Sequence, residues 1–169
     1  YIHPTILTRD GKRMSKSLGT GVDPLGLIEK YGADATRFGL IWQSMGGQDI
    51  HFSEEHCMAG KKFANKIWNI AKYVVQKTGG NFEEDLKLSS QELLGEVTGS
   101  EGYTDYWKSA DSGGYGAKLR TVTQDVTKCI DNYRFGEALH ILYDAVWHGF
   151  ADNYIEESKS KDDNETKKN

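Results

Sequence analysis

Long hydrophobic runs and paired cysteines are both missing from this sequence of 169 residues. Its apolar stretches are far shorter than the roughly 18–20 residues that cross a bilayer, so we expect no membrane-spanning helix and no membrane partner. Cys57 and Cys129 have no second cysteine nearby, which indicates neither a disulfide framework nor a zinc cluster. The histidines show no metal-ligand spacing, so we expect no metal site, and a reducing, cytoplasmic compartment.

The charge of the chain is small in total but unevenly distributed. The sequence has 21 Lys and Arg against 25 Asp and Glu, a net charge of −4, which argues weakly against a general nucleic-acid binder. Residues 58–82, however, contain several lysines and no acidic side chain. The average apolar content, 37%, predicts one ordinary folded core. Because the chain opens at Tyr1 within an expected strand, we expect it to be a piece of a longer protein.

Local signals place most of the secondary structure. Asp10-Gly11 predicts a tight turn, Asp23-Pro24 a helix start, and Ser53 the cap of a long helix whose Glu54 and Glu55 suit the positive end of the helix dipole. In chain order the signals predict a strand at 2–7, a flexible loop at 14–22, helices at 24–31 and 34–45, an extended segment at 48–52, a long helix from 53 to about 78, a short helix ending by 99, an irregular segment at 99–116, and paired closing helices at 119–130 and 138–154.

The expected fold is therefore mainly α: a helical bundle preceded by a short β element and a loop. We divide the chain into residues 1–52, a helical bundle at 53–158, and a charged tail at 159–169 that we expect to be disordered. Aromatic residues at helical spacing are expected in the core, and Asp152 is expected to pair with a neighbouring cation. These aromatic residues are Trp68, Trp147, Phe150 and Tyr154.

The segment Lys12–Ser17 carries the chemistry. It places three cations and two hydroxyls on a Gly- and Ser-rich loop immediately before a helix N-terminus. Lysine, arginine and hydroxyl donors on such a loop suit the oxygens of a phosphate group. The spacing does not match a Walker loop, and for an arbitrary basic loop a solvated turn is the simpler interpretation.

The order Met14-Ser15-Lys16-Ser17-Leu18-Gly19, followed by Asp23-Pro24 and then by Lys30 to Ala35, resembles the end of the catalytic domain of class I aminoacyl-tRNA synthetases. In that family the loop closes over ATP, and its second lysine stabilises the transition state of amino-acid activation. The resemblance implies that Lys16 is catalytic. It also implies that Arg13, Met14, Ser15, Lys16 and Ser17 bind ATP, although Arg13 stands where the family usually has a lysine.

Three further segments, at 46–53, 63–69 and 147–156, resemble the valyl branch of this family more than the isoleucyl or leucyl branches. The resemblance implies a part of an enzyme that uses ATP, Mg²⁺ and valine and charges a valine-accepting tRNA as a monomer. The family's nucleotide-binding domain and editing domain are not in this sequence, so we expect the piece to be inactive alone. An isoleucyl or leucyl enzyme and a non-catalytic tRNA-binding module remain alternatives.

Lysines of the long helix are the candidate tRNA contacts. In a tRNA-binding family these side chains suit phosphates, whereas elsewhere a lysine-rich face is usually only solvated. The candidates are Lys61, Lys62, Lys66 and Lys72.

Overall fold

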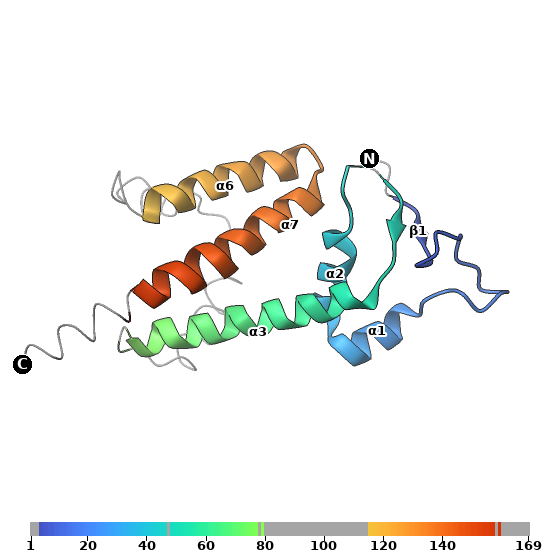
Figure 1. Ribbon diagram of the computed structural model, residues 1–169, viewed down its shortest axis with the longest axis horizontal. Coiled ribbons are helices and arrows are strands. Elements are labelled where there is room, and N and C mark those ends of the chain that lie inside the picture. The colour runs from blue at the N-terminus through green and yellow to red at the C-terminus, as the bar shows by residue number, and fades with distance from the viewer. Residues whose placement is uncertain (1–3, 47, 78, 80–114, 158, 160–169) are drawn as a thin grey trace, which may run out of the picture.

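A computed structural model describes residues 4–46, 48–77, 79, 115–157 and 159. It confirms a mainly helical fold with a small β element near the start of the chain (Figure 1). The elements are β1 (Ile6–Leu7), α1 (Pro24–Tyr31), α2 (Ala33–Trp42), β2 (Ile50–His51), α3 (Glu54–Lys77), α6 (Tyr115–Asp131), α7 (Phe135–Asp144) and the π-helix η1 (Ala145–Ile155). The expected short helix ending by residue 99 lies outside the described residues, as does the charged tail apart from Lys159.

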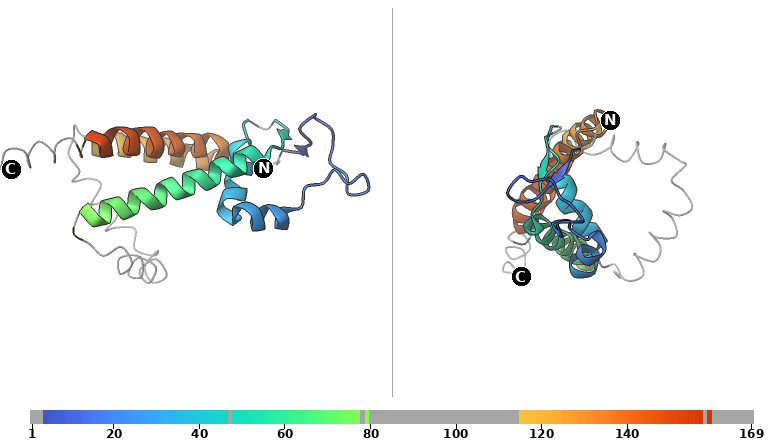
Figure 2. Two further views of the ribbon diagram at one scale, coloured as in Figure 1. Left: turned by 60° about the horizontal axis from the view of Figure 1, so that its bottom comes forward. Right: turned by 90° about the vertical axis from the view of Figure 1, so that its right-hand side faces the viewer.

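The helices occupy one side of the molecule and the loop lies at the opposite end, beyond α1 (Figures 1 and 2). In Figure 1 the helix that α7 and η1 form together lies along α3, nearest to it at η1, with α6 along the far edge of α7. The expected antiparallel pairing of the two closing helices is confirmed. Their turn is tight, with Tyr133 at a φ of 57° and the Arg134 amide donating to the Cys129 carbonyl at 2.8 Å.

The predicted start of α1 is confirmed in detail. The Asp23 carboxylate accepts hydrogen bonds from the amides of Leu25 and Gly26 at 3.1 and 3.3 Å, and Pro24 occupies the first turn. The helix ends at Gly32, whose φ of 94° would strain any residue with a side chain. This turn allows α2 to begin at once in a new direction.

The two short strands pair in parallel, with Ile6 opposite Ile50 and Leu7 opposite His51. The pairing brings the predicted strand and the predicted extended segment together, although nothing in the sequence indicated that they were partners. Ile50 is buried, and the Asp49 carboxylate accepts a hydrogen bond from the Thr5 amide at 3.1 Å. The segments that precede the loop and precede α3 are therefore tied to each other.

Helices α2 and α3 approach each other closely at two glycines. A Cβ on Gly39 would lie 2.7 Å from the Cys57 amide nitrogen, and one on Gly60 would lie 2.8 Å from Cβ of Phe38. Neither position has room for a methyl group. The core beside this crossing contains Leu27, Tyr31, Ala35, Phe52 and Cys57.

Aromatic rings join α2 and α3 to the closing helices. The His140 ring stacks on Trp42 with centroids 3.6 Å apart, and its Nε2 lies 3.1 Å from the Trp42 carbonyl oxygen. Tyr143 lies 4.9 Å from Phe63 and 5.3 Å from Trp147, centroid to centroid. Trp147 and Phe150 were expected in the core; both are half-buried, and Trp147 packs against Phe63 and Tyr143.

The last predicted helix departs from ordinary α-geometry. After α7 the backbone widens into η1, in which hydrogen bonds span five residues and not four. The stripe expected from a period of 3.6 residues therefore does not stay on one face: Ala151 and Ile155 are buried, whereas Tyr154 is 47% exposed. The expectation that Tyr154 lies in the core was wrong for this reason.

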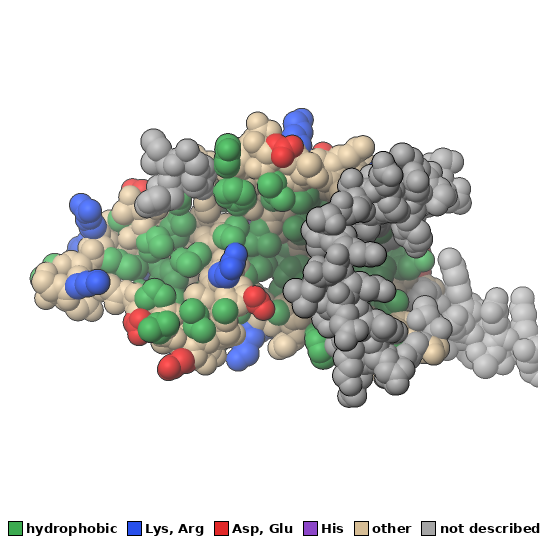
Figure 3. Space-filling view, turned by 180° about the vertical axis from the view of Figure 1, so that it is seen from behind, with side chains coloured by type: hydrophobic (Ala, Val, Ile, Leu, Met, Phe, Trp, Pro, Cys, Tyr) green, Lys and Arg blue, Asp and Glu red, His purple; other side chains and the backbone are tan. Residues whose placement is uncertain are grey.

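Two other expectations need correction. Helix α2 ends at Trp42, before the predicted end at residue 45, and the Gln43 side chain donates back to the Gly39 carbonyl at 2.7 Å. Trp68 is 53% exposed, because α3 buries the face that carries Phe63. The adjacent apolar stripe of Ala64, Trp68 and Ala71 is left exposed. That stripe borders a groove of about 550 Å³. Hydrophobic side chains also gather across the middle of the face in Figure 3.

Among the described residues, no helix is long and apolar enough to span a bilayer.

Candidate functional site

The predicted phosphate loop is held at its base by a tight hairpin. The Thr8 amide donates to the Lys12 carbonyl at 2.8 Å, and the Lys12 amide donates to the Thr8 hydroxyl at 3.0 Å. Arg13 then pairs with Leu7 in an isolated antiparallel bridge. The backbone on which Arg13 sits is thus an extension of the β element, while its side chain is exposed.

A second set of hydrogen bonds closes the loop into a ring. The Ser15 amide donates to the Thr20 hydroxyl at 2.9 Å, and the Thr20 amide donates to the Ser15 carbonyl at 3.1 Å. Inside the ring the hydroxyl oxygens of Ser15 and Ser17 lie 2.9 Å apart. The sequence did not indicate this role for Thr20, since a threonine in a Gly-rich loop gives no signal of its partner.

Lys16 belongs to this ring, since it lies between Ser15 and Thr20 in the chain. Its side chain is exposed and borders a cavity of about 380 Å³ that also touches Gly19, Gly21 and the first residues of α1. The N-terminus of a helix carries a partial positive charge, which Asp23 partly satisfies. A mobile ammonium group beside this helix end can follow an oxygen anion whose charge grows during a reaction.

Met14 differs from the other loop residues because it points inward. Its side chain is half-buried and packs against the core of Leu27, Tyr31, Ala35, Phe52 and Cys57. It also borders a second cavity of about 360 Å³, together with Thr20, Phe52 and Glu54. The apolar core therefore fixes the start of the ring, while Arg13, Lys16 and Ser17 remain at the surface.

A carboxylate at the start of α3 holds the segment that follows the loop. One oxygen of Glu54, Oε2, accepts from the Lys30 ammonium and from the Tyr31 hydroxyl, both at 2.7 Å. The hydrogen bond from Lys30 is the main cause that lowers the pKa of Glu54, and the same contact raises the pKa of Lys30. The sequence indicated only a dipole role for Glu54, because its partners are more than 20 positions away.

The candidate tRNA-binding lysines do not form one patch. Lys61 donates to the Lys30 carbonyl at 3.4 Å, and Lys66 pairs with Asp152 at 3.2 Å and lies over the Trp147 ring. Lys62 and Lys72 are exposed on α3. At 100° per residue the four positions spread over about 140° of the helix circumference.

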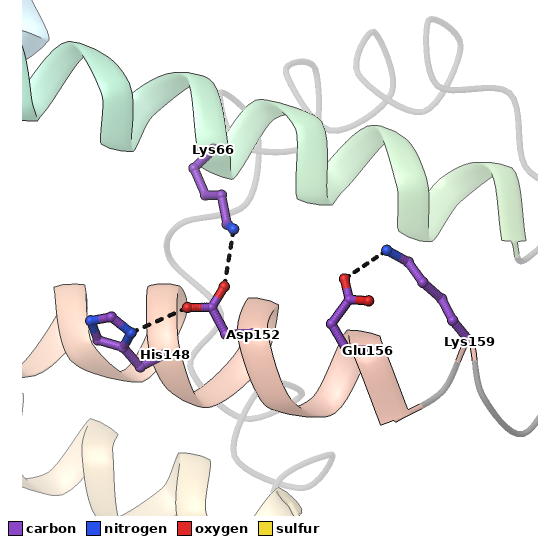
Figure 4. Close-up of polar contacts among 5 residues, drawn as sticks. All are labelled: Lys66, His148, Asp152, Glu156 and Lys159. Atoms are coloured by element: carbon purple, nitrogen blue, oxygen red, sulfur yellow. Dashed lines mark hydrogen bonds and ion pairs between the residues drawn. The ribbon is translucent and has the colours of Figure 1, made fainter.

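The expected pairing of Asp152 with a cation is confirmed (Figure 4). Its second carboxylate oxygen lies 3.2 Å from Nδ1 of His148, one turn earlier in η1. The hydrogen bond from Lys66 is the main cause that lowers the pKa of Asp152. The cluster joins α3 to η1 and occupies one of the candidate tRNA contacts.

No group of three or more His, Cys, Asp or Glu side chains that could hold a metal ion is found within the described part of the chain. The chemistry available at the loop end is cationic and hydroxylic, which suits phosphate oxygens and not a metal ion directly.

Comparison with known families matches both ends of the chain. Residues 1–53 match a model described as tRNA synthetases class I (I, L, M and V), and residues 116–169 match an anticodon-binding domain of tRNA ligase. The loop and its anchors lie within the first match, and α6, α7 and η1 within the second.

Similar proteins include valine–tRNA ligases from Streptococcus pyogenes, 39% identical over 99% of this chain, and Streptococcus pneumoniae, 41% identical over 94%. The chain spans 18% and 17% of the lengths of these relatives. The fold resembles, with a TM-score of 0.56 and 16% identity, a ternary complex of LeuRS, tRNA and LeuAMS from Agrobacterium radiobacter K84, covering 86% of this chain and 16% of that one. Over nearly its whole length the chain is therefore similar to a segment of valine–tRNA ligases, and its two ends match a class I tRNA synthetase model and an anticodon-binding domain model.

Proposed function

We propose that this segment supplies the ATP-phosphate loop and part of the tRNA-binding surface of a cytoplasmic, monomeric enzyme that activates valine and transfers it to tRNA. The observation that carries the proposal is the loop itself. Ser15, Lys16 and Ser17 lie in a hydrogen-bonded ring that precedes the capped N-terminus of α1, and the Lys16 side chain is exposed. The similarity to valine–tRNA ligases supports the choice of valine over isoleucine or leucine.

In the proposed reaction the carboxylate of valine attacks the α-phosphate of ATP, and pyrophosphate leaves. Negative charge then grows on the leaving oxygens, and Lys16 stabilises it as a mobile point charge. Arg13 adds a planar set of donors, and Ser15 and Ser17 add hydroxyl groups. Met14 contributes by anchoring the ring to the core, which places Lys16 without touching phosphate itself.

Mg²⁺ is proposed to arrive with ATP, where it neutralises phosphate charge when bound. The described residues of this chain offer it no carboxylate cluster, so we assign it no ligand here. The chain's own contribution to the phosphate site is the charge of Lys16 and Arg13.

The tRNA is proposed to contact the exposed side of α3. Lys62 and Lys72 carry the larger share, because their side chains are exposed and belong to none of the ion pairs within the described part of the chain. Lys61 and Lys66 reach phosphates only by giving up the Lys30 carbonyl and Asp152, respectively.

The test is valine-dependent exchange of pyrophosphate into ATP by the full-length enzyme and by its Lys16→Ala variant. We expect the rate constant to fall by about 100-fold or more, the size typical of losing one charge-stabilising group. Lys128→Ala, an exposed lysine on α6, is the control and is expected to leave the rate unchanged. Exchange that depends on isoleucine or leucine would contradict the valine assignment, and an unchanged rate for Lys16→Ala would contradict the role of Lys16.

A further inference from the structure

The loop is attached to the rest of the molecule through the segments on either side of it. Upstream, the hairpin at Thr8–Lys12 joins it to the β element. Downstream, the loop runs directly into α1, which is only eight residues long. Any shift of α1 therefore moves the point at which the loop ends.

The Glu54 side chain of α3 accepts two hydrogen bonds from the last turn of α1. Lys30 and Tyr31 are the final residues of α1, and both donate to the same oxygen of Glu54 at 2.7 Å. Lys30 also lies over the Tyr31 ring at 4.9 Å, so the two donors are held together. Glu54 is therefore a joint between the end of α1 and the beginning of the long helix, and the longer contact from Lys61 to the Lys30 carbonyl, at 3.4 Å, lies further along α3.

Unlike an ordinary surface ion pair, the Glu54 joint includes a buried side chain, that of Tyr31. Tyr31 is only 8% exposed, and its ring belongs to the core cluster against which Met14 of the loop packs. A connected set of contacts thus runs from Met14 through the core cluster that contains Tyr31 to the Tyr31 hydroxyl and Glu54. Rigid packing transmits displacement along such a series better than solvated side chains do.

The neighbouring carboxylate, Glu55, provides the contrast within the same helical turn. It pairs with Arg9 at 3.7 Å, and both side chains are largely exposed, at 77% and 82%. Exposed pairs of this kind have little influence on geometry because water and salt screen them. Both acids contribute similarly to the dipole at the start of α3, so any difference between their variants reports on the joint.

We propose that Glu54 is a positioning residue that acts through Lys30 and Tyr31: it fixes α1 against the first turn of α3 and so sets the position from which the signature loop meets ATP. The inference rests on the proposed function and adds to it a residue outside the signature motif. It also couples the tRNA-facing long helix to the ATP loop, because the first turn of that helix carries the joint.

The experiment uses the full-length enzyme with Glu54→Gln, Tyr31→Phe, the double variant, and Glu55→Gln as the matched control. Valine-dependent pyrophosphate exchange gives KM for ATP, KM for valine and kcat separately. We expect Glu54→Gln to weaken use of ATP, seen as kcat/KM for ATP, by about three- to tenfold, with KM for valine unchanged. Tyr31→Phe is expected to show a part of the same effect.

Non-additivity separates positioning from general damage. If Glu54 acts through Tyr31, the double variant loses no more than Glu54→Gln alone, whereas independent sites lose the product of the two factors. Equal ATP parameters for Glu54→Gln and Glu55→Gln, or fully multiplicative losses, would overturn the inference. If Glu54→Gln does not fold, Tyr31→Phe alone decides by the same ATP-against-valine comparison. Absence of valine-dependent exchange in the unsubstituted enzyme would instead contradict the proposed function.

Discussion

The two ends of the molecule are held by different forces. At the helical end, α2 and α3 meet through Gly39 and Gly60. The His140 ring, stacked on Trp42, and the Tyr143 ring, edge-to-face with Trp42, continue the contact to α7. At the loop end, Lys16, Ser17 and Leu18 are exposed, and hydrogen bonds such as those between Ser15 and Thr20 maintain the shape. Close packing tolerates little change, whereas a solvated ring of hydrogen bonds can open and close at low cost.

This contrast suits the proposed chemistry. A loop that follows growing charge on a phosphate has to move, and its mobility is useful only if its two ends start from fixed places. Met14 and Glu54 provide these fixed places, since the first packs into the core and the second holds the end of α1. The packed end of the molecule is therefore the reference against which the loop moves.

The largest effect is expected where α2 and α3 approach each other most closely, at Gly39 and Gly60. Gly60→Ala puts a methyl group 2.8 Å from Phe38 and 2.9 Å from the Ala35 carbonyl oxygen, so we expect a loss of about 1–3 kcal/mol in unfolding free energy. Thermal and urea unfolding of the 169-residue chain, followed by circular dichroism, measures the loss.

Gly26→Ala in α1 is the matched control for that substitution. The nearest atom to its added Cβ is an oxygen of Asp23 at 3.6 Å, an ordinary contact. Alanine is also the better helix former, so we expect a gain of about 0.5–1 kcal/mol. If both variants lost the same stability, the close approach of α2 and α3 would not be what makes Gly60 necessary.

Local sequence signals predicted the structure wherever the partner of a residue was near in the chain. The Asp23 cap of α1, the glycine at its end and the hairpin of α6 and α7 all depend on neighbours within a few positions. The parallel pairing of Ile6 with Ile50 was not predictable, because two-residue strands carry no register signal. The π-helical geometry of η1 also has no sequence signature, and it moved Tyr154 out of the core.

The candidate site divides in the same way. The loop residues Arg13 to Ser17 were found by their order alone, and whether they bind ATP stays a prediction. Glu54 and Thr20 were missed, because each acts through a partner that the fold brings to it. The lysines of α3 were selected as tRNA contacts by their charge alone. The sequence did not indicate that Lys66 would pair with Asp152 in the folded chain.

The salt dependence of tRNA binding tests the exposed and the paired lysines of α3 one at a time. With the full-length enzyme and a valine-accepting tRNA, the slope of log Kd against log salt concentration counts the phosphate contacts. We expect Lys62→Ala or Lys72→Ala to reduce that slope by about 0.9 each, since each removes one contact. Lys66→Ala is expected to change it less, because Asp152 already neutralises this side chain. Equal changes for all three variants would mean that Lys66 leaves Asp152 when tRNA binds.

The smallest expected effect concerns Asp152, which joins α3 to η1 at the surface. Its pKa in the folded chain is lowered from the ordinary value of 3.8, mainly by the hydrogen bond from Lys66. A lowered folded-state pKa stabilises the fold above the unfolded value and loses that effect as pH falls through the folded value. Asp152→Asn should therefore lower the melting temperature of the 169-residue chain by about one or two degrees at neutral pH, the size expected for an exposed pair, and by nothing well below pH 3.8.

Asp144→Asn, an exposed position at the end of α7, provides the control for the same scan. Its melting temperature should follow that of the unsubstituted chain at every pH, because the structure gives Asp144 no cation partner comparable to Lys66 among the described ion pairs. A difference between Asp152→Asn and the unsubstituted chain that persists in acid would show that the asparagine disturbs packing in η1. The contact with Lys66 would then be a consequence of the helix geometry and not one of its causes.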